Sequence, residues 1–194
     1  MPAPEFDRPR YIAIEGPVRV GKSSLARIVA EKFNARLFLE PEDNPHLSDF
    51  YAGKPGAAFR AQMHFLVQRY LQLSPLGAER PFTPMVADYI FEKDKIFAYI
   101  NLSDAELSVY NQYYELLRPQ IAVPDLWVYL HATPEVLRRR LERKNLEREQ
   151  QVSDEYLAEV VKAYDHFFCR YSQSDLLVIN TSETDFVEQD IDLQ

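Results

Sequence analysis

The sequence of 194 residues contains 30 acidic and 22 basic side chains, a formal charge of −8, and 12 Tyr and 12 Phe within a hydrophobic fraction of 46%. This length and aromatic content favour one folded domain over a disordered chain, and the single cysteine excludes an internal disulfide and a cysteine-based zinc site. The acidic balance and the lack of a membrane-length apolar segment lead us to expect a cytoplasmic protein that binds neither nucleic acid nor membrane.

Strands and helices are expected to alternate along the chain. Short apolar runs predict strands over residues 11–14, 37–39, 85–87, 126–130 and 176–179. Helical spacing or a capping residue predicts helices over about 22–34, 57–73, 103–117, from 134 onward, and 154–171. Strands separated by helices pair in parallel, so we predict an α/β domain over residues 1–194 with helices on both faces of its sheet.

A phosphate-binding loop is expected directly after the first strand. Residues 16–23 read GPVRVGKS and match the pattern G-x-x-x-x-G-K-[ST] at every fixed position. Gly16 and Gly21 leave room for backbone N–H groups to surround phosphate oxygens, while Lys22 supplies a positive charge to the phosphates. The Ser23 hydroxyl can bind Mg²⁺. We therefore predict that the loop binds a nucleoside triphosphate together with Mg²⁺, with Val18, Val20 and Ser24 also contacting the nucleotide.

Two carboxylates stand at the ends of the second and third predicted strands, where open α/β sheets bind their ligands. Glu40 could accept the proton of an attacking hydroxyl, or could be an ordinary surface glutamate before a proline turn. Asp88 could bind Mg²⁺, or could cap the next helix. Position in the sequence does not decide between these alternatives.

Basic residues concentrate late in the chain. Six of the 22 lie within residues 138–148, where even spreading would give about one. They could form a solvated helix face, and neighbouring glutamates leave ion pairs open. In a P-loop protein, however, such a segment can close over the triphosphate and stabilise transferred charge, so we favour a basic lid over about residues 138–152.

Together these landmarks resemble the deoxynucleoside kinase family, from about residue 11 to residue 186. Besides the phosphate loop, the likeness rests on ordered short motifs: EP at 40–41, Tyr51, FRAQ at 59–62 with Arg69 downstream, IFA at 96–98, YLHATPE at 129–135 and EYL at 155–157. The resemblance implies a P-loop kinase fold with a five-stranded parallel sheet. It also implies a homodimer that phosphorylates the 5′-hydroxyl of deoxynucleosides with ATP in nucleotide salvage.

The resemblance implies roles for individual residues as well. Glu40 matches the general base, and Arg140 and Lys144 match two of the basic positions of the lid. With Lys22 and Arg148, these are the residues we expect to act in catalysis. Tyr51 and Glu149 match residues that hold the 3′-hydroxyl. The nucleobase would be read by Gln62, Arg69 and Asp94 and packed by Phe97, although Gln62 and Arg69 alone would be taken for exposed polar residues. The loop beside the donor adenine would contain Glu183, Asp185 and Phe186.

The chain departs from the family after the third strand. Relatives often carry an acidic-Arg-Ser triplet there, whereas this chain has Asp88-Tyr89-Ile90. Tyr89 cannot replace a guanidinium, so another positive group, Arg148 or Arg143, is expected to compensate. Leu146 also occupies a position where relatives have a lid arginine.

Two other functions share the phosphate loop. A nucleoside monophosphate kinase, such as a thymidylate kinase, would need a phosphate-binding arginine near the acceptor, where Tyr89 stands. A P-loop regulator that binds GTP would be expected to carry an Asn-Lys-x-Asp motif, which the sequence lacks. We predict a deoxynucleoside kinase that prefers deoxyadenosine or deoxyguanosine, accepts deoxycytidine, and uses thymidine poorly.

Overall fold

The five strands form one parallel sheet in the order β2-β3-β1-β4-β5 in the computed structural model, which describes residues 9–41, 43–78, 84–144 and 152–183. The strands run over Tyr11–Glu15 (β1), Arg36–Phe38 (β2), Met85–Ala87 (β3), Leu126–His131 (β4) and Asp175–Asn180 (β5). All pairs are parallel, with Ala13 beside both Ala87 and Trp127. This confirms the predicted fold class. The chain leaves β1 toward one edge of the sheet and β3 toward the other, which opens a crevice at their carboxyl ends.

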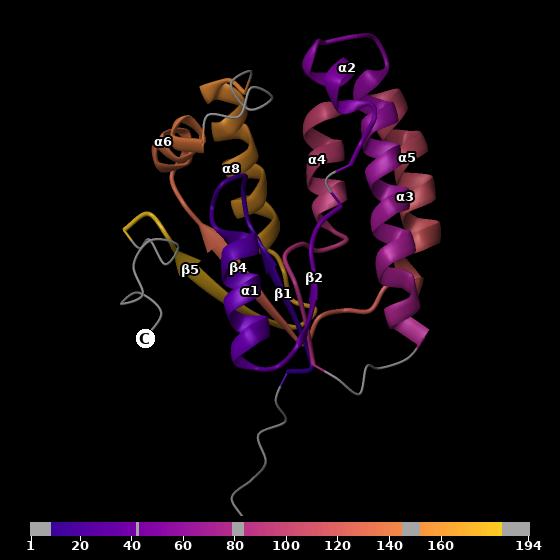
Figure 1. Ribbon diagram of the computed structural model, residues 1–194. Helices are drawn as coiled ribbons and strands as arrows, with labels where there is room; N and C mark the ends of the chain where they lie inside the picture. The colour runs from indigo at the N-terminus through magenta and orange to yellow at the C-terminus, as the bar shows by residue number, and fades with distance from the viewer. Residues whose placement is uncertain (1–8, 42, 79–83, 145–151, 184–194) are drawn as a thin grey trace, which may run out of the picture.

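The helices lie on both faces and beyond one edge of the sheet (Figure 1). They run over Lys22–Lys32 (α1), Leu47–Tyr51 (α2), Ala57–Ala78 (α3), Lys93–Asn101 (α4), Asp104–Leu117 (α5), Pro134–Lys144 (α6) and Asp154–Phe168 (α8), with a 3₁₀ turn at Arg118–Gln120. The predicted capping box of α5 is present, with Ser103 and Glu106 as its two residues. Helices α2 and α4 were not predicted.

Two hydrophobic cores cover the faces of the sheet. Because side chains alternate along a strand, Ala13 faces one side and Ile14 the other. The Ala13 face packs on α8 through Tyr164 and Phe168. The Ile14 face packs on α1 and α6. A third core lies between α3, α4 and α5, so these three helices form a layer beyond the β2 edge that walls off the crevice.

Among the described residues, no helix is both long and apolar enough to cross a membrane.

Candidate active site

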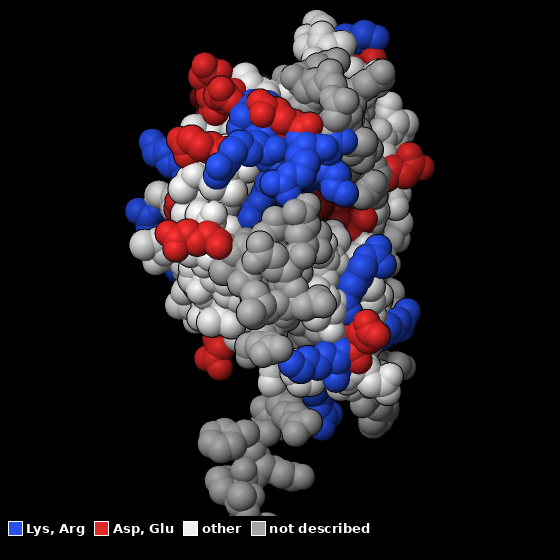
Figure 2. Space-filling model, turned by 60° about the vertical axis from the view of Figure 1, so that its left-hand side comes forward, with Lys and Arg blue, Asp and Glu red and all other residues white. Residues whose placement is uncertain are grey.

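One cavity of about 600 Å³ lies where β1, β2 and β3 end, and the predicted site residues converge on it. Its wall combines the loop before α1, the residues after β2 and β3, one face of α3 and α4, and parts of α6 and α8. The basic residues that line it are Arg19, Lys22, Arg27, Arg69, Lys93, Arg140, Arg143 and Lys144. Figure 2 shows Lys and Arg side chains gathered in one area of the surface, although the chain is acidic overall. The cavity therefore suits an anionic ligand.

The loop between β1 and α1 has the backbone geometry of a phosphate cradle. Gly16 and Gly21 adopt φ values of 153° and 108°, and a Cβ atom on Gly16 would lie 2.3 Å from the carbonyl oxygen of Leu130. The Lys22 ammonium donates to the carbonyl oxygens of Gly16 and Pro17, at 2.8 and 2.9 Å. Burial lowers the pKa of Lys22 to about 8, and the charge of Lys93 acts in the same direction. A phosphate placed here would offset both effects.

Ser23 and Asp88, the two residues predicted to hold Mg²⁺, contact each other. The Ser23 hydroxyl donates to one Asp88 oxygen, and the other accepts the backbone N–H of Glu40 at 2.6 Å. Asp88 does not cap α4, because the N-cap of that helix is Glu92. No group of three or more His, Cys, Asp or Glu side chains capable of holding a metal occurs within the described part of the chain. A hydroxyl and a carboxylate supply the oxygen ligands that Mg²⁺ prefers, so these two residues would fit that ion.

Glu40 lies between two cations at the end of β2. One oxygen accepts from Nη2 of Arg69 at 2.6 Å, and the other from Nζ of Lys93 at 2.5 Å. Burial would raise the pKa of Glu40, but Lys93 and Arg69 outweigh it and hold that pKa well below its usual range. The geometry contradicts an ordinary surface glutamate, because the carboxylate contacts two cations and lies on the cavity wall.

The residues predicted to read a nucleobase form one buried network. Gln62 donates from Nε2 to the backbone oxygen of Asp94 at 2.8 Å and to its carboxylate. Arg69 bridges Asp94 and Glu40, with its Nη1 2.6 Å from Asp94. Burial raises the pKa of Asp94 to about 7, although Arg69 opposes this. Gln62 and Arg69 are 5% and 3% exposed, so the expectation of exposed polar residues is wrong.

Asp94 and Phe97 occupy different places relative to the cavity. Phe97 lines it, whereas Asp94 has no exposed surface and lies behind Gln62 and Arg69. In this structure Asp94 therefore fixes the two side chains that face a ligand. Tyr51, at the end of α2, also lines the cavity.

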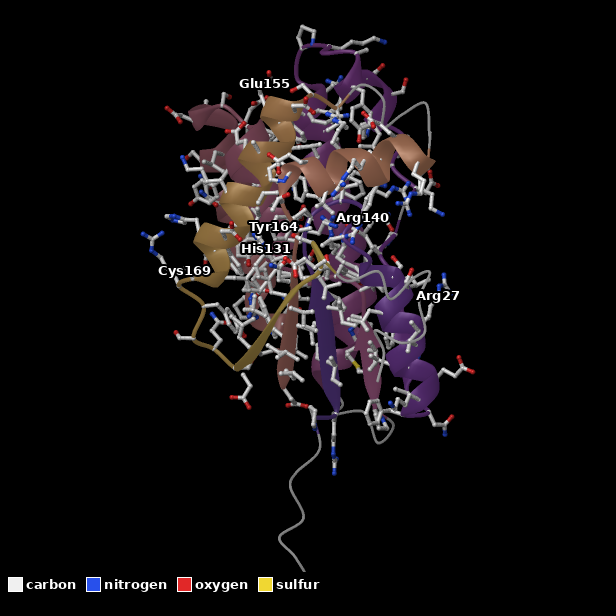
Figure 3. The ribbon with its side chains drawn as sticks, turned by 90° about the vertical axis from the view of Figure 1, so that its left-hand side faces the viewer. Arg27, His131, Arg140, Glu155, Tyr164 and Cys169 are labelled. Carbon is white, nitrogen blue, oxygen red and sulfur yellow. The ribbon has the colours of Figure 1, made fainter. Side chains whose placement is uncertain are left out.

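The basic end of α6 approaches the phosphate loop. Arg140 points from α6 toward the end of the sheet (Figure 3) and donates to the carbonyl oxygens of Thr181 at 2.7 Å and Val20 at 3.4 Å. Lys144 lies at the exposed end of the helix and lines the cavity. Arg148 and Glu149 lie outside the described residues, as does most of the predicted lid beyond α6.

The donor-adenine segment is described only in part. Glu183 is exposed just beyond β5, while Asp185 and Phe186 lie outside the described residues. Glu183 stands two residues after Thr181, which Arg140 contacts.

Sequence reasoning did not single out Lys93, although the structure places it beside Glu40 on the cavity wall. It is 8% exposed, lines the cavity and contacts Glu40. Neighbouring Tyr89, at the position where relatives often carry arginine, is fully buried and donates its hydroxyl to Gln72. The departure from the family pattern at position 89 was the one signal that a cation had to come from elsewhere.

A phosphate loop and a carboxylate on one cavity above a parallel sheet define a kinase of the P-loop class. Residues 12–193 match the family model described as deoxynucleoside kinase, and the chain belongs to that family. It is 32% identical to the deoxyguanosine kinase of Bacillus subtilis over 184 residues, covering 91% of this chain and 89% of that protein. It is 27% identical to the deoxyadenosine kinase of Lactobacillus acidophilus, with 92% and 88% covered.

A solved structure has the same fold. The deoxyadenosine kinase from M. mycoides with bound dATP superposes with a TM-score of 0.80 at 21% identity, covering 95% of this chain and 97% of that one. The family match confirms the resemblance inferred from the motifs. It also confirms the predicted type of enzyme, a deoxynucleoside kinase, against a thymidylate kinase or a P-loop regulator. The roles of individual residues remain predictions.

Proposed function

We propose that the protein transfers the γ-phosphate of ATP to the 5′-hydroxyl of a deoxynucleoside, preferably a purine deoxynucleoside, and serves nucleotide salvage in the cytoplasm. The observation that carries this proposal is that Glu40 and the phosphate loop with Lys22 and Ser23 line the same cavity. A general base and a triphosphate site within one cavity are what in-line transfer between two bound substrates requires.

The residues divide the work of transfer between them. The loop N–H groups and Lys22 bind the ATP phosphates. Glu40 accepts the proton of the 5′-hydroxyl while the 5′-oxygen of the deoxynucleoside bonds to the γ-phosphorus and ADP leaves. Ser23 and Asp88 would hold Mg²⁺, which when bound neutralises phosphate charge and orients the triphosphate. Arg140 and Lys144 stabilise the charge on the transferred group, and Arg148 is proposed to join them.

The wall near α3 favours a nucleobase that presents N–H groups. The two hydrogen bonds of Gln62 to Asp94 require its amide nitrogen to face Asp94, so the Gln62 carbonyl oxygen remains to accept from a ligand. Adenine, guanine and cytosine each carry an exocyclic amino group that can donate to this oxygen, whereas thymine offers only its ring N3–H. The names of the two purine deoxynucleoside kinases quoted above support the purine preference. Tyr51 and Glu149 are proposed to hold the 3′-hydroxyl.

A homodimer would cover an apolar surface on neighbouring helices. Val67 and Leu71 of α3 are 44% and 59% exposed, and Val109, Tyr113 and Leu116 of α5 are 42%, 50% and 68% exposed. Helices α3 and α5 pack against each other, so the two sets can form one surface that a second copy would bury. Light scattering of the purified protein would test this, and a monomer at micromolar concentration would contradict it.

The central experiment tests the acceptor. Purified protein is incubated with ATP and Mg²⁺ and with each of the four deoxynucleosides or their monophosphates in separate reactions. We expect 5′-monophosphates from deoxyadenosine or deoxyguanosine as the major products, with a thymidine rate about 5- to 150-fold lower, which corresponds to 1–3 kcal/mol for unpaired acceptors. Diphosphates formed only from monophosphates would contradict the proposal, as would the absence of any transfer.

A further inference from the structure

We infer that Lys93 is a positioning residue for phosphoryl transfer: its ammonium group fixes the carboxylate of Glu40 toward the 5′-oxygen and supplies the positive charge that Tyr89 cannot. This inference rests on the proposed function, because it assigns a partner to the proposed base.

The first observation is the placement of Lys93. It is the first residue of α4, its side chain is 10% exposed, and its Nζ lies 2.5 Å from Oε2 of Glu40. The same nitrogen lies 5.8 Å from the ring centroid of Phe97, the aromatic predicted to pack on the nucleobase. Lys93 therefore reaches the base carboxylate from the side of the acceptor site.

The second observation is the arrangement around Glu40. Arg69 holds one carboxylate oxygen from α3, and Lys93 holds the other from α4. Two cations on two different oxygens fix both the position and the plane of a carboxylate, which a single ion pair would leave free to rotate. The backbone N–H of Glu40 also donates to Asp88, so contacts hold both the backbone and the carboxylate of this residue.

The third observation is that position 89 is turned away from this cluster. Tyr89 has no exposed surface, and its hydroxyl donates to Gln72, whose amide donates in turn to the carbonyl oxygen of Leu39 at 3.2 Å. Tyr89 thus anchors the backbone just before Glu40 but brings no charge. Four residues later the chain supplies a buried lysine, where the expectation had been Arg143 or Arg148 from the lid side.

Energetics argue against a purely structural role. Lysine is among the residues least often buried, and replacing a buried ion pair by apolar side chains of similar size is often neutral or stabilising. A lysine kept at 8% exposure on a cavity wall, beside the proposed base, is better explained by what it does to a ligand-facing group. Loss of its contact would let the carboxylate shift by roughly 1 Å, which can reduce turnover by about 10²-fold.

The experiment compares Lys93→Met with Lys95→Met, a control on the same helix. Lys95 pairs with exposed Glu115 at 3.0 Å. With ATP, Mg²⁺ and deoxyadenosine or deoxyguanosine, we expect Lys93→Met to lower kcat about 10²-fold, with the KM for ATP changed less than about threefold. Lys95→Met should match the wild type. Lys93→Arg, which retains the charge, should have a kcat at least about tenfold higher than that of Lys93→Met. If Lys93→Met does not fold, Lys93→Gln takes its place.

A double variant separates positioning from an independent contribution. If Lys93 acts through Glu40, the variant Glu40→Gln/Lys93→Met should be no slower than Glu40→Gln alone. Losses that multiply would overturn the inference, and so would a Lys93→Met enzyme within about threefold of the control. A wild-type protein that phosphorylates no deoxynucleoside would overturn the proposed function itself, and this inference with it.

Discussion

Gly16 provides the sharpest test of the phosphate loop. Its φ of 153° is a conformation that L-residues rarely adopt, and a Cβ atom there would lie 2.3 Å from the backbone oxygen of Leu130 and 3.0 Å from Cγ1 of Val20. Leu130 is paired with Ile179 inside the sheet and cannot retreat. Restoring an ordinary C···O separation of about 3.3 Å therefore displaces the loop by roughly 1 Å. We expect Gly16→Ala to lose about 2–6 kcal/mol of unfolding free energy, from backbone strain and overpacking together.

Gly53 offers a matched control. Its φ is 66°, and within the described part of the chain no atom lies within 4 Å of an added Cβ atom, so Gly53→Ala incurs backbone strain of only about 1–2 kcal/mol. Urea unfolding and steady-state kinetics with varied ATP would compare the two. Gly16→Ala should also lose about 10²-fold in kcat/KM for ATP, while Gly53→Ala should not. Equal stability and equal kcat/KM in the two variants would refute the clash with Leu130.

Three further predictions follow from the charged residues. Glu40→Gln should lower kcat by about 10²–10⁴-fold with ATP binding retained, and near-normal turnover would contradict its role as base. Arg140→Ala should lower kcat at least about tenfold but change the Kd of the deoxynucleoside less than about threefold, measured by calorimetry; equal losses in both would favour a general packing role. Burial raises the pKa of Asp94 from 3.8 to about 7, so the folded state binds this proton more tightly than the unfolded chain. The resulting stabilisation is complete below about pH 4 and is lost as the pH rises through 7. Asp94→Asn should therefore flatten the unfolding free energy over that range, and an unchanged pH dependence would show that Asp94 does not titrate there.

Local patterns were sufficient to predict the sheet and the phosphate loop. Each strand is a short apolar run bounded by turn or polar residues, and the loop motif fixes both the end of β1 and the start of α1. Helix α2 escaped prediction because five residues are too few to show a period. Helix α4 escaped because it begins with two buried charged residues, Lys93 and Asp94, where an amphipathic pattern would place apolar ones.

The interior of the site depends on contacts that no local pattern contains. Gln62 and Arg69 look like a polar helix face until α4 is packed against α3, which brings Asp94 to them across 32 and 25 residues of sequence. The resemblance to a family named these residues but not their arrangement, in which Asp94 lies behind the other two. The resemblance also did not point to Lys93, because the acidic-Arg-Ser triplet of the family places the cation at residue 89.

The bridge that Arg69 forms between Asp94 and Glu40 limits how substrate choice can be redesigned. Exchanging Asp94 to admit another nucleobase removes the carboxylate that Arg69 shares, and the guanidinium is then free to bind Glu40 more strongly or to leave it. One substitution at Asp94 would thus change both the substrate specificity and the turnover. Directed evolution toward new nucleoside analogues should therefore succeed with coupled changes at positions 69 and 94 more often than with either alone.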